Sequence, residues 1–365
     1  MKTTIFREND ADLSLVKDKV ISVIGYGNQA KAQALNMRDS ELEVIIGITD
    51  EKYKKRSERD GFENLSIAEA VQRGEFIFLL LPDKDMSESF ETQVKPHFNE
   101  KKTLIFSEGY YLAFNIIEIP KDIDVLLISP RALGEVVRKQ FINKEGFFTF
   151  IGINQESSLN AMNHLLALTK AIGGLKQAAI KMTFKQQSIL KLFSEQAFRA
   201  AFNQVLMRSI KNLEEAGYPP EAIYIELILS EEMIYTVDKM IKVGLIKQMN
   251  FHSQTSQYGS LSRGVKYSKV GGDIEKIHKI FLENIENGQF SEEWEQYKNT
   301  QKLDIMKKFA FNTNFSKLEK GIYKNLNYSI PEIQKELEVS SKEQINQNQE
   351  LKNTYETYKK FYNQF

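Results

Sequence analysis

The segment ISVIGYGNQA, residues 21–30, constrains the fold of this chain more than any other. An apolar run enters a glycine turn and continues into a segment of helical character. Gly25 permits a tight turn off a strand, Gly27 lets the backbone approach a phosphate, and Ala30 allows a helix to pack closely on a sheet. The amino end of that helix would present free N–H groups and a positive dipole to an anion. The pattern therefore predicts a dinucleotide site.

Two further apolar runs extend this pattern. Residues 44–48 are followed by Thr49 and Asp50, about where an acidic residue meets the adenosine ribose. Residues 76–80 run toward Pro82, which ends the strand and places a loop at the carboxyl edge of the sheet, where ligands bind. The residues expected to contact the cofactor are Gly25, Tyr26, Gly27, Asn28, Gln29, Ala30, Thr49, Asp50, Pro82, Asp83 and Gly109.

The residues after the second apolar run bear on the choice of cofactor. Asp50 and Glu51 would repel a 2′-phosphate and accept hydrogen bonds from free ribose hydroxyls. Lys54 or Lys55, in contrast, could reach a phosphate. The balance favours NADH slightly over NADPH.

Composition restricts the partners and the compartment. The 49 Lys and Arg residues balance 49 Asp and Glu residues, so no global field attracts nucleic acid or an anionic membrane. The charged amino terminus lacks the apolar core of a signal peptide, and the apolar runs are only strand-length, which predicts a soluble cytoplasmic protein. Because the chain contains no cysteine, any metal would need oxygen or histidine ligands.

The first part of the chain predicts an α/β domain. Short β-rich runs alternate there with segments of helical spacing, which indicates parallel strands of a doubly wound sheet covered by helices. These runs are Val20–Ile24, Val44–Ile48, Phe76–Leu80, Thr103–Phe106, Val125–Ile128 and Phe147–Ile151.

After Gly173 and Gly174 the strands are expected to end and amphipathic helices to begin. The helical stretches cover about 183–215, 220–243 and 273–287. We therefore predict a Rossmann-type domain over 1–181, an all-helical domain over 182–325 and a polar extension over 326–365. A peripheral helix and a loosely attached tail fit the extension equally well.

Many ordered segments of the chain match the pattern of one family. They are the fingerprint Gly25–Ser40, Leu80–Asp83, Ile105–Gly109, Ser129–Arg138, Ala171–Gly174, Thr183–Lys185, Leu192–Gln196, Glu215–Glu221 and Ser253–Gly259. Over roughly residues 15 to 300 the chain resembles the ketol-acid reductoisomerases. The resemblance implies a nucleotide-binding domain followed by a helical domain that pairs with a second copy, so that two chains share each active site. It also implies an alkyl shift driven by two Mg²⁺ ions, followed by hydride transfer from a nicotinamide to the resulting 2-keto acid.

The chain departs from this family at the catalytic positions. Glu108 stands where the family has a histidine, and Arg131 stands where it has a lysine. Lys191 replaces an aspartate that bridges both metals in the family, four residues before the matching glutamate, Glu195. An ammonium supplies no lone pair, and about 4 Å from a divalent ion it would cost on the order of 8 kcal/mol.

The second half of the family's metal site is also altered. Glu226 matches a family ligand, but Ser230 replaces the next one. Relative to the family pattern, about two residues are inserted between Glu226 and Gly244, so Glu231 or Glu232 could supply the missing carboxylate. We therefore predict no metal site, with Glu195 and Glu226 as ligands only if Lys191 moves away. The candidate catalytic residues are Glu108, Arg131, Lys191, Glu195, Glu226 and Ser253.

Three hypotheses for function follow from these departures. In the first, the isomerase step is lost and an NAD(P)H-dependent reductase acts on a 2-keto acid, ketol or imine, while the Lys191 ammonium stands in for a metal between Glu195 and Glu226. Glu108 would then donate a proton or contact substrate, and Arg131 would clamp a substrate carboxylate. The second hypothesis is a genuine ketol-acid reductoisomerase of valine and isoleucine synthesis. The third is a non-catalytic paralogue that binds a dinucleotide or a protein partner, which the simultaneous loss of the family's histidine, aspartate and lysine positions favours. Whatever the function, Lys191 and Glu195 could also form no more than a surface ion pair.

Overall fold

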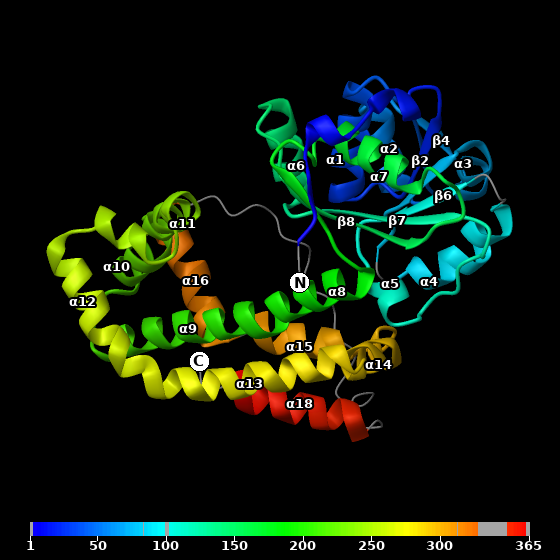
Figure 1. The fold of residues 1–365 in the computed structure, drawn as a ribbon. Helices are drawn as coiled ribbons and strands as arrows, with labels where there is room; N and C mark the ends of the chain where they lie inside the picture. Colours follow the sequence, from blue (N-terminus) through cyan, green and yellow to red (C-terminus); the bar gives the residue numbers. More distant parts are fainter. Residues whose placement is uncertain (1–2, 83, 99–101, 312, 328–348, 363–365) are drawn as a thin grey trace. The chain divides into compact units, whose positions relative to one another are not determined.

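The computed structural model describes residues 3–82, 84–98, 102–311, 313–327 and 349–362. The chain divides into two compact units, Met1–Lys191 and Leu192–Phe365 (Figure 1). The first unit is α/β and the second is helical, as the sequence predicts. None of the described helices combines the length and the apolar character that a membrane span requires.

The first unit is built on one nine-stranded sheet with the order β1-β9-β8-β7-β6-β5-β2-β3-β4. The strands are β1 (Ile5–Phe6), β2 (Val20–Ile24), β3 (Glu43–Gly47), β4 (Glu63–Leu65), β5 (Phe76–Leu79), β6 (Thr103–Phe106), β7 (Asp124–Pro130), β8 (Phe148–Gln155) and β9 (Ala178–Lys181). Strands β4 to β7, with β2 and β3, pair in parallel and form the Rossmann-type core.

Two details of the sequence-based sheet are wrong. Strand β8, expected to be parallel, runs antiparallel to β7 and pairs Ile128 with Ile151. Strands also continue past Gly174, because β9 pairs in parallel with β8 and antiparallel with β1. An apolar run buried on both faces reads the same in either direction, so composition cannot reveal strand polarity.

Helices pack on both faces of the sheet and on one another; α6, for example, packs along α1. They are α1 (Asn28–Asp39), α2 (Glu51–Arg59), α3 (Ile67–Arg73), α4 (Met86–Ser89), α5 (Tyr110–Ala113), α6 (Gly134–Ile142), α7 (Ala161–Ala171) and α8 (Phe184–Phe193), with short 3₁₀ turns and one π turn between them. Strand β5 shows how the two cores arise: Phe76 and Phe78 face the side of α1 and α7, while Ile77 and Leu79 face the side of α3. Successive side chains point to opposite faces, so a fully apolar strand fills both layers.

The second unit is entirely helical among its described residues. Its elements are a π-helix (Ser194–Arg199), α9 (Ala200–Glu215), α10 (Pro220–Tyr224), a second π-helix (Ile225–Leu229), α11 (Glu232–Val243), α12 (Gln254–Gly264), α13 (Ser268–Glu286), α14 (Gln289–Tyr297), α15 (Lys302–Phe311), α16 (Asn314–Asn325) and α18 (Gln349–Tyr362), with 3₁₀ turns at Lys247–Phe251 and Val265–Tyr267. A small core cluster joins Ile210, Ile223, Tyr224 and Ile322.

The polar extension includes one described helix. Helix α18 packs along α15, and the Tyr355 ring meets Phe309 edge-on at 4.7 Å between ring centroids. Thr354 on the same helix is buried. Residues 328–348 lie outside the described part of the chain.

Candidate active site

The glycine turn between β2 and α1 is closed on one side and open on the other. Gly25 has φ +95°, and a Cβ there would lie 2.6 Å from the carbonyl oxygen of Leu80. At Gly27, the residue that caps α1, a Cβ would meet no heavy atom of the described chain within 4 Å. The first turn of α1 contains no acidic residue. The turn thus leaves space and free N–H groups where an anion can approach the helix.

Side chains of α1 hold this turn against the sheet. Ala30 is buried, and the Gln29 amide donates to the carbonyl of Ala132 at 2.7 Å. One turn later the buried Gln33 donates to the Ser107 hydroxyl at 3.1 Å. These bonds tie the helix to the loops after β6 and β7, so the amino end of α1 has a fixed place at the carboxyl edge of the sheet.

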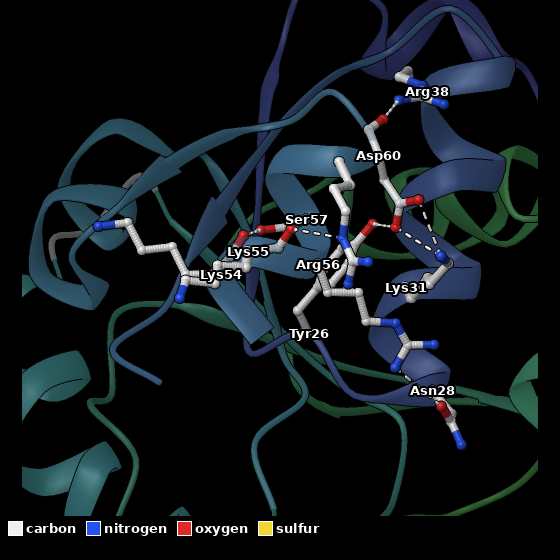
Figure 2. A network of polar contacts seen from close by, with 10 residues as sticks. Tyr26, Asn28, Lys31, Arg38, Lys54, Lys55, Arg56, Ser57 and Asp60 are labelled. Atoms are coloured by element: carbon white, nitrogen blue, oxygen red, sulfur yellow. Dashed lines mark hydrogen bonds and ion pairs between the residues drawn. The ribbon is translucent and has the colours of Figure 1, made fainter. Parts of the chain in front are cut away.

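Tyr26 anchors the turn through a polar network around Asp60 (Figure 2). Its buried hydroxyl donates to the Asp60 carboxylate at 2.9 Å, and Lys31 lies 2.7 Å from the same carboxylate. Burial and this bond raise the pKa of Tyr26. Burial opposes ionisation of Asp60, but the hydrogen bonds from Lys31 and Tyr26 outweigh it and lower the pKa of that carboxyl. The Tyr26 side chain therefore serves the fold and leaves only its backbone for a cofactor.

Thr49 and Asp50 are exposed at the end of β3. Asp50 caps α2, and its Oδ1 accepts from the backbone N–H groups of Lys52 and Tyr53 at 2.8 and 3.2 Å. Within α2, Lys54 lies 3.8 Å from Glu51, and Arg56 reaches toward Asn28 with a 3.4 Å hydrogen bond (Figure 2). The acidic side chains at the start of α2 thus stand beside the carboxyl edge of the sheet.

The remaining expected cofactor contacts lie at two loops. Pro82 is exposed after β5, and Asp83 lies outside the described residues. Gly109 follows β6 and is buried; a Cβ there would lie 2.4 Å from the carbonyl oxygen of Phe184. Only glycine allows α8 to pack this close to the loop.

Two residues that depart from the family pattern, Glu108 and Lys191, are in contact. Glu108, after β6, and Lys191, near the end of α8, form a hydrogen-bonded ion pair between Oε1 and Nζ. Their side chains are 38% and 26% exposed, so the pair is open to solvent on one side. Glu108 was not among the partners that the sequence suggested for Lys191. The loop after β6 and helix α8 together place an ammonium and a carboxylate at one point.

Arg131 lies directly after β7. Its backbone N–H donates to Phe148 at 2.8 Å, its guanidinium lies 5.0 Å from the centre of the Phe150 ring, and Nη1 donates to the Ser129 hydroxyl at 3.3 Å. Stacking on an aromatic face and a bond to a hydroxyl hold the planar fork in one orientation. The side chain remains exposed and can bind an anionic group.

The second unit holds the other three candidates on separate elements. Glu195 lies in the first π-helix, and Glu226 lies in the second. Short π segments inside helices often occur at functional sites. Ser253 caps α12 and accepts from the backbone N–H of Ser256 at 3.2 Å.

The helix that carries Glu226 ends soon after it. Ser230 donates its hydroxyl to the Glu226 carbonyl at 3.2 Å, and Glu231 has φ +60°, which breaks the path into α11. This break falls where the sequence suggested an insertion.

The sequence did not identify two polar residues of the site, Gln187 and Ser129. The Gln187 side chain accepts from the Gly109 N–H at 2.7 Å, and its Nε2 donates to the Ser129 hydroxyl at 3.4 Å. Gly109 directly follows Glu108, and Ser129 stands two residues before Arg131, so the two residues lie beside both candidate catalytic positions. One signal was present in the sequence: Gln187 stands four residues before Lys191, on the same face of a helix. Nothing in the sequence shows that this face meets the ends of β6 and β7.

The parallel core of the sheet, the glycine turn and the polar groups at its carboxyl edge are typical of a class of protein, the NAD(P)-binding enzymes with a Rossmann-type domain. Two family models match the chain: acetohydroxy acid isomeroreductase, NADPH-binding domain, over residues 15–178, and ketol-acid reductoisomerase, C-terminal domain, over residues 184–328. The chain belongs to the ketol-acid reductoisomerase family, as the resemblance implied.

Individual relatives agree with this assignment. The chain is 38% identical to the ketol-acid reductoisomerase (NADP(+)) of Petrotoga mobilis over 291 residues, which cover 79% of this chain and 87% of the relative. A solved NADH-preferring ketol-acid reductoisomerase from an uncultured archaeon matches with a TM-score of 0.82 and 31% identity, over 88% of this chain and 98% of that one. A pyrroline-5-carboxylate reductase from Coxiella burnetii, 11% identical with a TM-score of 0.52 over 74% of this chain and 98% of that one, shares the fold alone.

Proposed function

We propose that this family member is an NAD(P)H-dependent reductase of a 2-keto acid, ketol or imine that does not carry out the Mg²⁺-dependent alkyl shift. The observation that carries the proposal is the ion pair between Lys191 and Glu108. Both positions depart from the family pattern, and the negative charge of Glu108 balances the positive charge of Lys191.

The residues at this point do not fit a pair of Mg²⁺ ions. Mg²⁺ takes several oxygen ligands, and bridged ions need carboxylates to offset their repulsion. Lys191 brings a positive charge instead, and it engages one oxygen of Glu108. Glu195 and Glu226 keep the role proposed from the sequence, as carboxylates that would bind a metal only if Lys191 moved away.

The glycine turn fits a dinucleotide. Gly27 and the amino end of α1 would receive the pyrophosphate, with Gly25, Asn28, Gln29 and Ala30 forming the turn. When bound, the nicotinamide supplies a hydride to the carbonyl carbon of the substrate.

The chain's own groups would serve the other half of the reduction. Lys191 holds a proton at Nζ and would pass it to the carbonyl oxygen, and Glu108 orients the ammonium. Arg131, held by Ser129 and Phe150, would bind a substrate carboxylate. In sum, one 2-keto acid takes up one hydride and one proton and becomes one 2-hydroxy acid.

Activity assays separate this proposal from the genuine isomeroreductase, which the 38% identity to the Petrotoga mobilis enzyme favours. We expect the wild type to oxidise NAD(P)H with the 3-hydroxy-3-alkyl-2-keto acid that an alkyl shift would produce, and to do so in the presence of EDTA. Acetolactate with Mg²⁺ should give no turnover. Turnover of acetolactate that requires Mg²⁺ would contradict the proposal and establish the second candidate.

The variant Lys191→Met tests the proton donor. Loss of a general acid lowers rates by about 10²- to 10⁴-fold, so we expect kcat to fall within that range while NAD(P)H binding persists. Lys185→Met, on the exposed side of the same helix, is the matched control and should keep kcat. An unchanged kcat in Lys191→Met would remove the proposed role.

We also propose a slight preference for NADH. The proposal rests on the Asp50 carboxylate, which the cap of α2 holds beside the adenosine side of the site. Asp50→Asn tests it without removing the cap, because asparagine caps helices as well as aspartate does. The ratio of kcat/KM with NADH to that with NADPH should exceed one in the wild type and fall in the variant. A strong NADPH preference of the wild type would overturn the proposal.

We further propose that the chain forms a homodimer through its helical unit. Exposed apolar residues support this: Ile234, Val237 and Ile241 follow one face of α11. Phe198, in the first π-helix, lies about two turns before Val205 in α9, and both are exposed. Apolar patches of this kind mark interaction surfaces in proteins.

A further inference from the structure

The amide of Gln187 is buried deeply between two loops of the first unit. The residue is 1% exposed and lies on α8, one turn before Lys191. Its Oε1 accepts from the Gly109 N–H at 2.7 Å, and its Nε2 donates to the Ser129 hydroxyl at 3.4 Å. Because a backbone N–H can only donate, the oxygen must face Gly109 and the nitrogen must face Ser129. The orientation of this amide is therefore determined by its partners.

These two bonds lead to the two halves of the proposed site. Gly109 directly follows Glu108, whose carboxylate pairs with Lys191. Ser129 also accepts from the Arg131 guanidinium at 3.3 Å. One amide thus joins the end of β6, which carries the carbonyl-activating pair, to the end of β7, which carries the carboxylate clamp.

Helix α8 holds the loop after β6 at two consecutive residues. Lys191 binds the side chain of Glu108, and Gln187 binds the backbone of Gly109. Side chains four residues apart lie above one another on a helix, so both contacts come from one face. The close approach of Gly109 to Phe184 on the same helix leaves this loop little freedom to shift.

We propose that Gln187 is a positioning residue that sets the register between the Lys191–Glu108 pair and Arg131. The inference rests on the proposed reductase function, in which one group acts on the carbonyl and the other on the carboxylate of the same substrate. Misplacement of reacting groups by about 1 Å can lower a rate by about 10²-fold. A buried amide that makes both of its bonds can hold such a register, because breaking either bond leaves a polar group unpaired.

The test compares two variants of Gln187 in the full-length protein. Gln187→Met keeps the length of the side chain and removes both bonds; we expect kcat for the 2-keto acid to fall by about 10²-fold, with the Kd for NADH within about twofold of the wild type. Gln187→Glu keeps an acceptor for Gly109, and its second oxygen can accept from the Ser129 hydroxyl. This variant should retain at least about a tenth of kcat.

A double-mutant cycle distinguishes positioning from a loss of stability. Arg131→Met alone should raise KM for the keto acid, and its effect should shrink in the Gln187→Met background because the clamp is no longer in register. Hydrogen exchange at the Gly109 amide should become faster in Gln187→Met and stay slow in Gln187→Glu.

The outcomes separate the two proposals. Additive effects, unchanged exchange at Gly109, or an unchanged kcat in Gln187→Met with an active wild type would overturn the role of Gln187 alone. A folded wild type that reduces no keto acid, ketol or imine would overturn the proposed function, and this inference with it.

Discussion

The two units of this chain bury their apolar residues very differently. In the first unit, two large clusters fill both sides of the sheet, and strands such as β5 are buried along their whole length. Among the described residues of the second unit, one small cluster around Tyr224 joins α9, α10 and α16, while Ile241 is 79% exposed and Ile234 is 66% exposed. The first unit completes its core within one chain, and the described part of the second leaves apolar stripes uncovered.

This difference assigns different tasks to the two units. The sheet places the glycine turn, Glu108 and Arg131 on the carboxyl ends of buried strands, so one chain is sufficient to order them. The helical unit presents faces that gain stability only when another surface removes them from water. We therefore expect this difference in burial to disappear in an assembled homodimer, where the apolar residues of the second unit would be as well buried as those of the first.

The largest expected effect comes from a charge on the exposed stripe of α11. Ile241→Glu should convert the dimer to monomers, with dimer dissociation increased by at least about 100-fold, because an unpaired charge would have to be buried. Sedimentation velocity over a range of concentrations measures this change. Leu159→Glu, at a fully exposed residue of the first unit, is the control and should leave the assembly intact. A wild type that is monomeric at micromolar concentration would contradict the homodimer.

A pair of glycine substitutions tests whether the glycine turn of the first unit is closed at Gly25 and open at Gly27. Gly25→Ala should lower the free energy of unfolding by about 1–3 kcal/mol, because its φ is positive and its Cβ would overlap the Leu80 carbonyl. Gly27→Ala should leave unfolding unchanged, since the space there is open in the described chain, and should weaken NADH binding by about tenfold. Thermal unfolding and fluorescence titration with NADH provide the two measurements. Equal stability losses in both variants would show that the turn is not open at Gly27.

The smallest expected effect is on the pH dependence of the free energy of unfolding, through His164 on α7. Burial lowers the pKa of His164 from 6.5, and its ring meets Phe76 edge-on at 5.1 Å. Below pH 6.5 the unfolded chain binds this proton before the folded chain does, so the free energy of unfolding should decrease as the pH falls. Urea unfolding between pH 7.5 and 5.5 measures the slope. This slope reports how many more protons the unfolded chain binds than the folded chain. In His164→Gln that number should be smaller by less than one. An unchanged slope would show that His164 does not contribute.

Much of the first unit could be predicted from residue order alone. Strands β2 and β6 have the expected bounds, and Gly25 takes the left-handed conformation that a tight turn needs. These features are local: a strand depends on a short run of apolar residues, and a turn depends on one residue without a side chain. The antiparallel direction of β8 could not be predicted, because it depends on which strand edge is free after α6.

The candidate site required the tertiary structure. The sequence suggested Glu195 and Glu226 as partners of Lys191, since helical spacing and the family pattern were the only guides. The partner observed is Glu108, which lies 83 residues away along the chain. Gln187 was overlooked because a glutamine in a helix has no chemical signature until its amide meets the ends of two strands.

The order of residues by itself determined the dinucleotide turn, the α/β unit followed by a helical unit, and the family, because these depend on short motifs and on periodic burial. The fold alone decided that the ammonium of Lys191 meets the carboxylate of Glu108 and that one buried amide links Gly109 to Ser129. Such contacts join residues from different elements. They exist only when β6, β7 and α8 pack together, and packing is a property of the whole unit rather than of any segment in it.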